Sequence, residues 1–495
     1  MADKTAGCLD RRQTLNCTRN DDQSAGREPI SGTASALARS EGMKHNEHQE
    51  SRIMNTAELS ARAPLAKPAS RSRADERGAS ASGNVERRSF LKTLGTAGAA
   101  LSASALAGTA AVAQANRAQI SKGDAALLRF AAAAEIIESD LWLQYAELGG
   151  VQDDEVSLLA SKLIPGYPAK ATGGNPIYTK NLQTLDGDMP QYIHDNAEDE
   201  LTHEVFLNTY LAFKGAEIVS LDKFRTLQGS RATGANKSFG RLTNLIRLTV
   251  DTTWWTRYRS RTKNPDFGDT FQPAIPTLAA GQHTAIPRTD ADTGNADFIQ
   301  AVASTAGFHF AFIEQGGMSL YQQLAQRASN AEVLRVLLSI GGVEICHFQT
   351  WHDKAGNAPT QRNVVDPVTN VSVTFPNLNA PPFGGQDFQT NLIMPEPTAF
   401  LSRQFPPCSI IRPTETNGAA TTFAKALIDD GLFVGQSAEF LKLWQHLAAD
   451  ADTPLSAASD AARRTNARGA ANNERPRVCH QETRDGRRRE TGPRR

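Results

Sequence analysis

Residues 197–205 read AEDELTHEV and residues 341–349 read GGVEICHFQ, and each stretch contains a glutamate followed three residues later by a histidine. The pairs are Glu200 with His203 and Glu344 with His347. Residues three apart on an α-helix lie on one face, so each pair can hold a metal ion from one side. A single pair of this spacing arises often by chance in a long chain. The surrounding sequence must therefore decide whether the two pairs form one site.

A glutamate on a predicted amphipathic helix precedes each pair. Apolar residues recur at helical spacing over 124–148, which contains Glu135, and over 297–327, which contains Glu314. Each half of the chain thus supplies one glutamate from one helix and a Glu-x-x-His pair from the next. This arrangement predicts that four helices point their metal-binding side chains toward a common centre.

The choice of glutamate in the first half rests on a weak internal repeat. Trp142 lies seven residues after Glu135, just as Tyr321 lies seven residues after Glu314. Glu138, one turn beyond Glu135, competes for the role, because another aromatic residue lies seven positions after it. The repeat favours Glu135, and Glu138 stays open as the alternative.

The combined residue types explain the predicted chemistry. Four carboxylates neutralise two divalent cations, and oxygen and imidazole donors without thiolates favour iron or manganese over a structural zinc ion. The alternative is that these glutamates are core residues whose hydrogen bonds are all made within the protein, without a metal. Four buried glutamates would, however, repel one another and lose their hydration. The sequence therefore predicts a site for two iron ions, with manganese as the alternative, and its ligands are Glu135, Glu200, His203, Glu314, Glu344 and His347.

The helical pattern predicts an all-α fold. Four long helices are expected at 124–148, 190–214, 297–327 and 331–354. The first connection reads as a loop with at most a short helix, and the second is a long crossover with a helical patch at 244–258. Short, long and short connections indicate a four-helix bundle in which a crossover joins helices two and three.

The predicted bundle domain covers 116–355, and a loop-rich extension over 356–450 follows it. The extension contains a short strand-like segment at 371–375 and a terminal helix at 419–448. Residues 451–495 are rich in Arg, Asn and Gly and read as a disordered basic tail.

Residues 1–85 are predicted to be a disordered leader, and residues 86–115 resemble a twin-arginine signal peptide. The segment begins ERRSFLK, continues with a weakly apolar Gly, Ala and Ser-rich run, and ends in the small-x-small pattern AQA at 113–115. A buried Ala-rich helix is the alternative, and the run is too weakly apolar for a stable membrane anchor. The expected partner is the twin-arginine export machinery, which would deliver the folded chain to the periplasm or the cell exterior with its metal already bound.

The net charge and the cysteine content give less information about function than the Glu-x-x-His pairs do. Lys plus Arg equals Asp plus Glu at 53 each, so the overall charge gives no reason to expect a nucleic-acid partner. None of the five cysteines forms a Cys-x-x-Cys pair. Cys346 and Cys408 are the disulfide candidates, and Cys346 is expected to be a buried thiol because it lies on a predicted core helix.

Several polar and aromatic residues are candidates for supporting roles. Asp199 precedes Glu200 and is either an acceptor for a ligand histidine or a solvated residue, whereas the equivalent position in the second pair is Val343. Trp142 and Tyr321 either line the site or belong to the core. His309 and His352 are expected to be structural or exposed, and Trp254 and Trp255 are expected to pack the crossover onto the bundle.

These motifs resemble the ferritin-like superfamily. The segment LRFAAAAE at 128–135, followed by Glu138, Asp140 and Leu141, is similar to the first helix of its exported or desiccation-related branch. The resemblance covers about 230 residues, from Ala125 to Lys354, and implies a di-iron carboxylate bundle with the six ligands named above. The first loop and the crossover are longer than in ferritin, so an oligomer is compatible with the sequence but a hollow storage cage is not expected.

Two classes of function follow from these predictions. The leading hypothesis is ferroxidase or oxidoreductase-type chemistry, in which the metal pair reacts with dioxygen or peroxide. The alternative is a non-catalytic protein that sequesters metal or protects against stress and uses the metals to hold the bundle together. The sequence names no catalytic residue and no substrate.

Overall fold

The computed structural model describes residues 119–453 except 261, 383, 385–394, 396 and 412–417. The predicted leader at 1–85, the signal peptide at 86–115 and nearly all of the basic tail at 451–495 lie outside the described residues. Within them, no helix combines the length and the apolar character needed to cross a membrane.

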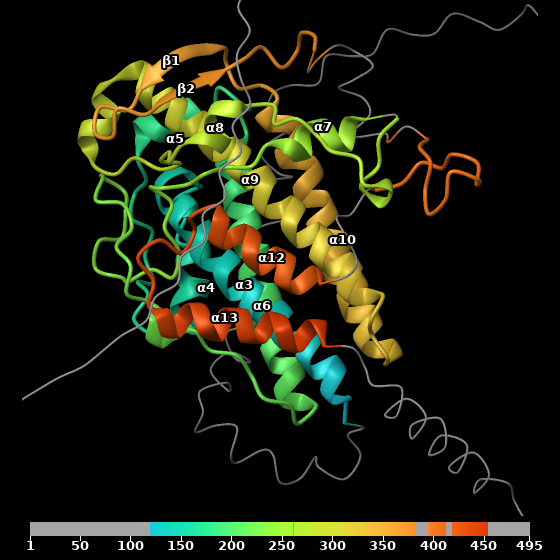
Figure 1. The fold of residues 1–495 in the computed structure, drawn as a ribbon. Coiled ribbons are helices and arrows are strands. Elements are labelled where there is room, and N and C mark those ends of the chain that lie inside the picture. The colour runs from blue at the N-terminus through green and yellow to red at the C-terminus, as the bar shows by residue number, and fades with distance from the viewer. Residues whose placement is uncertain are drawn as a thin grey trace, which may run out of the picture. The chain divides into compact units, whose positions relative to one another are not determined.

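Four long helices form the bundle in Figure 1: α3 (Lys122–Gly149), α6 (Met189–Phe213), α9 (Ala296–Ala325) and α10 (Ala331–Ala355). Helix α3 packs along α6, and α9 packs along α10. A short turn joins α9 to α10, whereas a long crossover joins α6 to α9. The predicted all-α bundle with its crossover between helices two and three is confirmed.

Local sequence signals set the ends of these helices. The side chain of Ser121 accepts a hydrogen bond from the backbone N–H of Asp124 at the start of α3. Asn295 and Asn330 cap α9 and α10 in the same way. From Phe130 to Gly149 every residue of α3 is buried, as expected of a helix at the centre of a large domain. The polar side chains on this buried stretch therefore need partners inside the protein.

The first connection contains more helix than its sequence predicts. Two short helices, α4 (Glu155–Leu163) and α5 (Pro176–Leu182), replace the expected single one. The Asn175 side chain caps α5, and Pro176 occupies its first turn, where a missing N–H costs nothing. Because α4 buries Val156, Leu159 and Ala160, its stability comes from packing that a local pattern does not reveal.

The crossover contains less helix than predicted, and this expectation was wrong for most of 244–258. Only α7 (Thr253–Arg259) and the short α8 (Pro276–Ala280) are α-helical there. The backbone N–H of Leu248 instead donates to the carbonyl of His283, and the N–H groups of Asn244 and Thr249 donate to the carbonyls of Leu432 and Asp430. Tertiary hydrogen bonds thus replace helical ones along this stretch.

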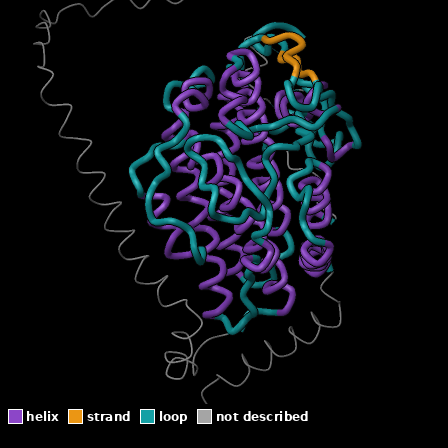
Figure 2. The backbone as a smooth tube through the Cα atoms, turned by 90° about the vertical axis from the view of Figure 1, so that its left-hand side faces the viewer, coloured by secondary structure: helices purple, strands orange, loops and turns teal. Residues whose placement is uncertain are grey.

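The described residues of the C-terminal extension form one small sheet and two helices. Strands β1 (Gln361–Val365) and β2 (Ser372–Phe375) pair in antiparallel fashion at one end of the bundle, as Figure 2 also shows. The single helix predicted at 419–448 is wrong, because the structure has α12 (Ala419–Asp429) and α13 (Ala438–Asp452). Gly431 and Gly435 between them adopt positive φ angles, which interrupt a helix. Helix α12 packs on α9, and α13 packs on α3.

Both described cysteines, Cys346 and Cys408, are exposed and free. The expectation of a buried Cys346 thiol was therefore wrong. Cys346 lies on α10 two residues after the buried Glu344, and a step of two along a helix turns the side chain to the opposite face.

Candidate metal centre

Each long helix of the bundle brings predicted ligands to one place in the interior. Helix α3 supplies a single glutamate, α6 a Glu-x-x-His pair, α9 a single glutamate and α10 the second pair. All four carboxylates are at most 1% exposed, and both imidazoles are nearly buried. The structure thus brings together all six residues: Glu135, Glu200, His203, Glu314, Glu344 and His347.

The six side chains fall into two groups, each of a size that suits one metal ion. One comprises Glu135, Glu200, His203 and Glu344, and the other Glu200, Glu314, Glu344 and His347. Within each group the candidate ligand atoms lie within 4.8 Å of one another. Glu200 and Glu344 belong to both groups. Each group therefore has its own glutamate and histidine, and two glutamates are placed to bridge a pair of cations.

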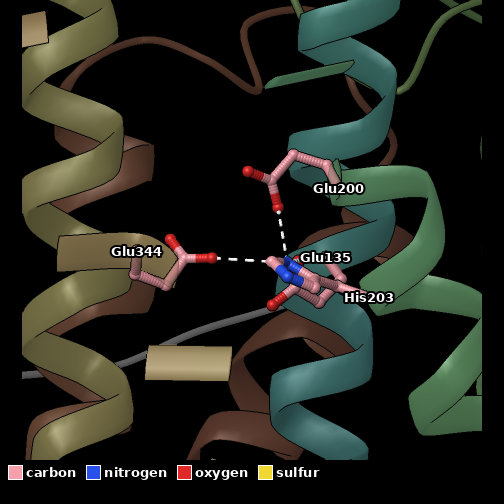
Figure 3. A group of neighbouring side chains, drawn as sticks. All are labelled: Glu135, Glu200, His203 and Glu344. Carbon is pink, nitrogen blue, oxygen red and sulfur yellow. Dashed lines mark hydrogen bonds and ion pairs between the residues drawn. The ribbon is translucent and has the colours of Figure 1, made fainter. Parts of the chain in front are cut away.

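The first group surrounds the Nδ1 atom of His203 (Figure 3). This atom lies 3.1 Å from an oxygen of Glu200, and 3.4 Å from oxygens of Glu135 and of Glu344. In Figure 3 the residues reach this point from α3, α6 and α10. Three carboxyl groups around one imidazole nitrogen form a set of donor atoms that suits a cation.

The second group has the same arrangement around His347. Its Nδ1 atom lies 3.1 Å from Oε1 of Glu200 and 3.2 Å from Oε2 of Glu314. Both histidines thus turn Nδ1 toward the carboxylates and Nε2 away from them. The pairs Glu200–His203 and Glu344–His347 are related by the internal repeat of the sequence, and here they face each other across the bundle.

Burial makes the charged form of these carboxyl groups unfavourable in the metal-free protein. It raises the pKa of Glu135 to about 8. Burial and the neighbouring Glu200 raise the pKa of Glu344 well above its ordinary value. Burial also raises the pKa of Glu200, but hydrogen bonds from His203 and His347 outweigh it and hold the value below the usual range. In the metal-free protein these raised pKa values favour protonated carboxyl groups, and a bound cation would replace the protons.

The histidines respond to the same negative charge. Burial alone would lower the pKa of each imidazole. The carboxylate of Glu135 nevertheless raises the pKa of His203, and that of Glu314 raises the pKa of His347, both well above the ordinary value. In the metal-free protein these imidazoles carry a proton in the position that a metal cation would occupy.

Unsatisfied oxygen atoms show how well the site suits cations. Oε2 of Glu344 is buried with neither a hydrogen bond nor an ion pair among the described residues, and Oε1 of Glu344 and Oε2 of Glu135 have only the 3.4 Å ion pair with Nδ1 of His203. Such buried acceptors are costly unless something positive binds them. Gly317 on α9 makes room for Glu344, since a Cβ atom there would lie 2.4 Å from its Oε2. The donor set of carboxylates and imidazoles fits two oxygen-preferring metal ions.

Glu138 is a fifth carboxylate beside the two groups. It is buried, its Oε2 atom has no hydrogen-bond partner in the described part of the chain, and burial and Glu344 raise its pKa well above the ordinary value. Its oxygens are not members of either metal-sized group, whereas those of Glu135 are. Of the two alternatives that the sequence leaves open, Glu135 has the geometry of a ligand and Glu138 stands next to it.

Asn196 positions two carboxylates and was missed by the sequence. Its amide nitrogen donates to Oε1 of Glu200 at 2.8 Å and to Oε1 of Glu314 at 2.9 Å. Its own oxygen accepts a hydrogen bond from Nε1 of Trp351 at 2.6 Å. The one available signal was the position of Asn196 four residues before Glu200, which puts it on the same helical face.

The two aromatic residues of the internal repeat have different roles. The hydroxyl of Tyr321 donates a hydrogen bond to Glu135, so this tyrosine lines the site. Trp142 stacks on Trp351 with ring centroids 5.2 Å apart and belongs to the aromatic core beside Asn196. For Tyr321 the first alternative is therefore correct, and for Trp142 the second.

Asp199 confirms the predicted contact to a ligand histidine. Its Oδ2 atom lies 3.1 Å from Nε2 of His347. A carboxylate there fixes the orientation of the ring and the position of its hydrogen. Val343 stands in the equivalent position of α10, and Nε2 of His203 makes no hydrogen bond with any described residue. The two halves of the centre thus differ in their outer contacts.

The other predicted supporting residues lie in the core. His309 contacts the hydroxyl of Tyr145 at 2.8 Å and Asp430 at 3.2 Å, which ties α9 to the start of the α12–α13 loop. The rings of Trp254 and Trp255 pack against His352 and hold the crossover on the bundle. These roles agree with the expected structural ones.

Comparison with known families gives one match. Residues 123–356 match the model of the family described as ferritin-like domain. No curated protein and no solved structure matches the chain. The matched segment begins in α3, ends just after α10 and contains all six clustered side chains. Residues 123–356 of this chain are therefore similar to a ferritin-like domain.

Proposed function

We propose that this protein binds two iron ions in the bundle and carries out ferroxidase or oxidoreductase-type chemistry with dioxygen or peroxide. The observation that carries the proposal is the sharing of Glu200 and Glu344 between two metal-sized groups. Two separate mononuclear sites would not require shared carboxylates. A bridged pair of redox-active ions would supply the two electrons that reduction of such oxidants needs.

The side chains have distinct tasks in this proposal. Glu135 and His203 would hold one ion, Glu314 and His347 would hold the other, and Glu200 and Glu344 would contribute to both positions. Tyr321 and Asn196 restrain the carboxylates through hydrogen bonds. The surrounding aromatic core keeps bulk water away from the pair.

Iron is the proposed metal, and manganese is the alternative. The ligands comprise carboxylate oxygens and imidazole nitrogens only, which both metals accept. The exposed Cys346 lies outside both groups, so no thiolate favours zinc or copper. Elemental analysis of protein purified without added metal would decide between iron and manganese.

Export through the twin-arginine route is part of the proposal. It is supported by the sequence ERRSFLK at 86–92 and by the small-x-small pattern that follows. A metal centre whose ligands come from four helices forms only when the bundle folds, which suits a route that carries folded proteins. A reporter fused after residue 120 should reach the periplasm, and replacing Arg87 and Arg88 by lysine should retain it in the cytoplasm.

A non-catalytic role is the second candidate, and the crowding of buried carboxylates favours it. Glu138 adds a fifth carboxylate to the four predicted ligands, so metal binding would relieve repulsion and stabilise the fold whether or not the ions react. In this case the protein would sequester metal or use it to hold the bundle together.

Anaerobic loading followed by oxygen separates the two candidates. The full chain without metal is titrated with Fe(II), and dioxygen is then admitted while the absorbance is followed. Chemistry predicts saturation at two irons per chain and oxidation much faster than that of free Fe(II) in the same buffer. Tight binding without accelerated oxidation would support the non-catalytic role instead.

Glu344→Gln provides the variant for this experiment, because Glu344 belongs to both groups. It should weaken both metal positions and abolish rapid oxidation. Glu439→Gln is the matched control, since Glu439 lies on α13 with its side chain 70% exposed. A Glu344→Gln protein that binds two irons as tightly as the unchanged protein would contradict the assigned ligands.

A further inference from the structure

The two ligand histidines differ in what their outer nitrogen contacts. Nε2 of His347 lies 3.1 Å from the Asp199 carboxylate, which α6 places directly before Glu200. Helix α10 places Val343 directly before Glu344, and Nε2 of His203 makes no hydrogen bond within the described part of the chain. A metal-binding histidine normally donates its second N–H to a carboxylate, a carbonyl or water. One half of the centre therefore lacks an acceptor that the other half has.

A pocket lies beside His203, the histidine that lacks an acceptor for its Nε2 atom among the described residues. Its volume is about 550 Å³, and it is lined by residues of α6 and α10. Among the six proposed metal ligands His203 alone lines it, together with Val343. Since the Nδ1 atom of His203 faces the carboxylates, its Nε2 atom is on the side of the ring that faces the pocket. The volume falls within the range of about 300–1,000 Å³ that small-molecule sites occupy.

The wall of the pocket is mainly apolar. Phe206 from α6 and Val336, Ile340 and Val343 from α10 contribute hydrophobic surface. Phe206 is 50% exposed, so its ring contributes accessible apolar surface to the lining. An apolar ligand body would cover this surface and remove it from water.

The charges of the lining favour an anion. Glu332 is the one lining carboxylate, and Lys214 neutralises it at 2.7 Å. Arg335 also lines the pocket, and no carboxylate of the residues that the structure describes is paired with it. Among the described residues, the pocket lining therefore contains one arginine without a carboxylate partner and one imidazole whose Nε2 atom has no hydrogen-bond acceptor.

We propose that this pocket binds an amphipathic monocarboxylate, such as a medium-chain fatty acid or an aromatic acid. The ligand carboxylate accepts a hydrogen bond from Nε2 of His203, in the role that Asp199 has at His347. The apolar body lies along Phe206, Val336 and Ile340, and Arg335 attracts the anion. The proposal rests on the proposed metal function only in treating His203 as a ligand through Nδ1, which leaves the hydrogen on Nε2.

Calorimetric titration of the full chain with octanoate and with 1-octanol tests the proposal. The two probes share an apolar chain and differ in the carboxylate. Octanoate should bind one molecule per chain, with an affinity at least about tenfold higher than that of 1-octanol. Added salt should weaken octanoate binding, because Arg335 is exposed to the solvent.

Val343→Asp is the decisive variant, because it supplies His203 with the acceptor that Asp199 provides for His347. It should lower the octanoate affinity at least about tenfold. The new carboxylate would accept the hydrogen bond from Nε2 of His203 and would repel the carboxylate of octanoate. Leu338→Asp is the matched control, since Leu338 lies on α10 with 57% exposure and does not line the pocket. It should leave octanoate binding unchanged.

A second measurement applies if Val343→Asp does not fold. The ring ¹⁵N signal of His203 Nε2 is recorded in the zinc-loaded protein without substitutions. Octanoate should shift this signal, and 1-octanol should not.

Three results would overturn the proposal. Equal affinity for octanoate and 1-octanol would mean that Nε2 donates to water only. Unchanged binding by Val343→Asp would place the carboxylate elsewhere. A dimer in sedimentation, with octanoate binding that appears only on dissociation, would mean that a second copy of this chain covers the pocket.

Metal content measured on the same samples keeps the two proposals separate. If the protein binds octanoate but takes up no iron, the proposed iron chemistry is contradicted and the proposed carboxylate pocket is supported. If the protein takes up two irons but does not bind octanoate, the proposed carboxylate pocket is contradicted and the proposed metal function is unaffected.

Discussion

The amide of Asn196 acts on the centre without belonging to either group of candidate ligands. It holds one oxygen each of Glu200 and Glu314, and Trp351 fixes the amide in turn. The two carboxylates are thus oriented before a metal arrives, which lowers the entropic cost of binding.

Asn196→Ala should therefore weaken metal binding by about 10- to 100-fold without changing the number of ions bound at saturation. Competition with a chelator of known affinity measures the effect. Asn208→Ala is the control, because Asn208 also lies on α6 but hydrogen-bonds the backbone of Val219. An equal loss of affinity in both variants would contradict a specific role for Asn196.

The two neighbouring glutamates of α3 are predicted to respond differently to the same change. Glu135→Gln should lower metal affinity at least about tenfold, since a charged ligand is lost. Glu138→Gln should keep both ions, because Glu138 is outside the two metal-sized groups and its raised pKa already favours the neutral form. Metal titration of both variants makes the comparison, and the reverse order of affinities would make Glu138 the ligand.

At the level of the helices, small residues decide how closely α9 approaches the centre. Gly317 lies on α9 one turn after Glu314, which is the repeat position of Glu138 on α3. The absence of a side chain at Gly317 leaves the space that Glu344 occupies and that Glu138 borders. The two halves of the bundle are therefore related by repeat but not identical, and this asymmetry lets α3 carry two buried glutamates.

Gly317→Ala should destabilise the fold by about 1–3 kcal/mol, because its Cβ atom would lie 2.4 Å from Oε2 of Glu344. Gly342→Ala is the matched control on α10, where a Cβ atom meets nothing within 4 Å. That control should stabilise by about 0.5–1 kcal/mol, since alanine is the better helix former. Denaturant unfolding of the metal-free proteins measures both changes, and equal effects would show that the space beside Glu344 is not restrictive.

For the whole molecule, the buried charges make stability depend on pH and on metal together. The carboxyl group of Glu135 has its pKa raised by burial from 4.5 to about 8, and those of Glu344 and Glu138 are raised in the same direction. Above pH 4.5 the folded metal-free state therefore holds protons that the unfolded chain has lost. The histidines add to this difference above their ordinary pKa of 6.5, because their pKa values are also raised.

The metal-free protein should consequently lose stability as the pH rises from about 5 to about 8, by about 1.4 kcal/mol per pH unit for each proton retained in the folded state. Thermal unfolding at a series of pH values measures this trend. Glu344→Gln should reduce the slope. Metal should remove it, because bound cations replace the protons. A melting temperature of the metal-free protein that rises over this range would contradict the expectation.

Local patterns were sufficient to predict the bundle and the six candidate ligands. The spacing of Glu200 from His203 and of Glu344 from His347 is a property of a single helix, so it can be read from consecutive residues. Apolar periodicity located the four long helices for the same reason. The predicted helix at 419–448 failed at Gly431, and the helical patch at 244–258 failed because its backbone is bonded to distant segments.

The tertiary structure alone decided how the helices share their charges. Three features depend on distances between helices: which glutamates belong to both metal-sized groups, the contact of Asn196 with two carboxylates, and the different surroundings of His203 and His347. Residues on one helix have fixed relative positions, whereas the rotation and spacing of packed helices follow from the shape of the whole core. The sequence by itself therefore determined the residue types of the candidate ligands and the helices that carry them, and the packing of those helices determined how the side chains cluster.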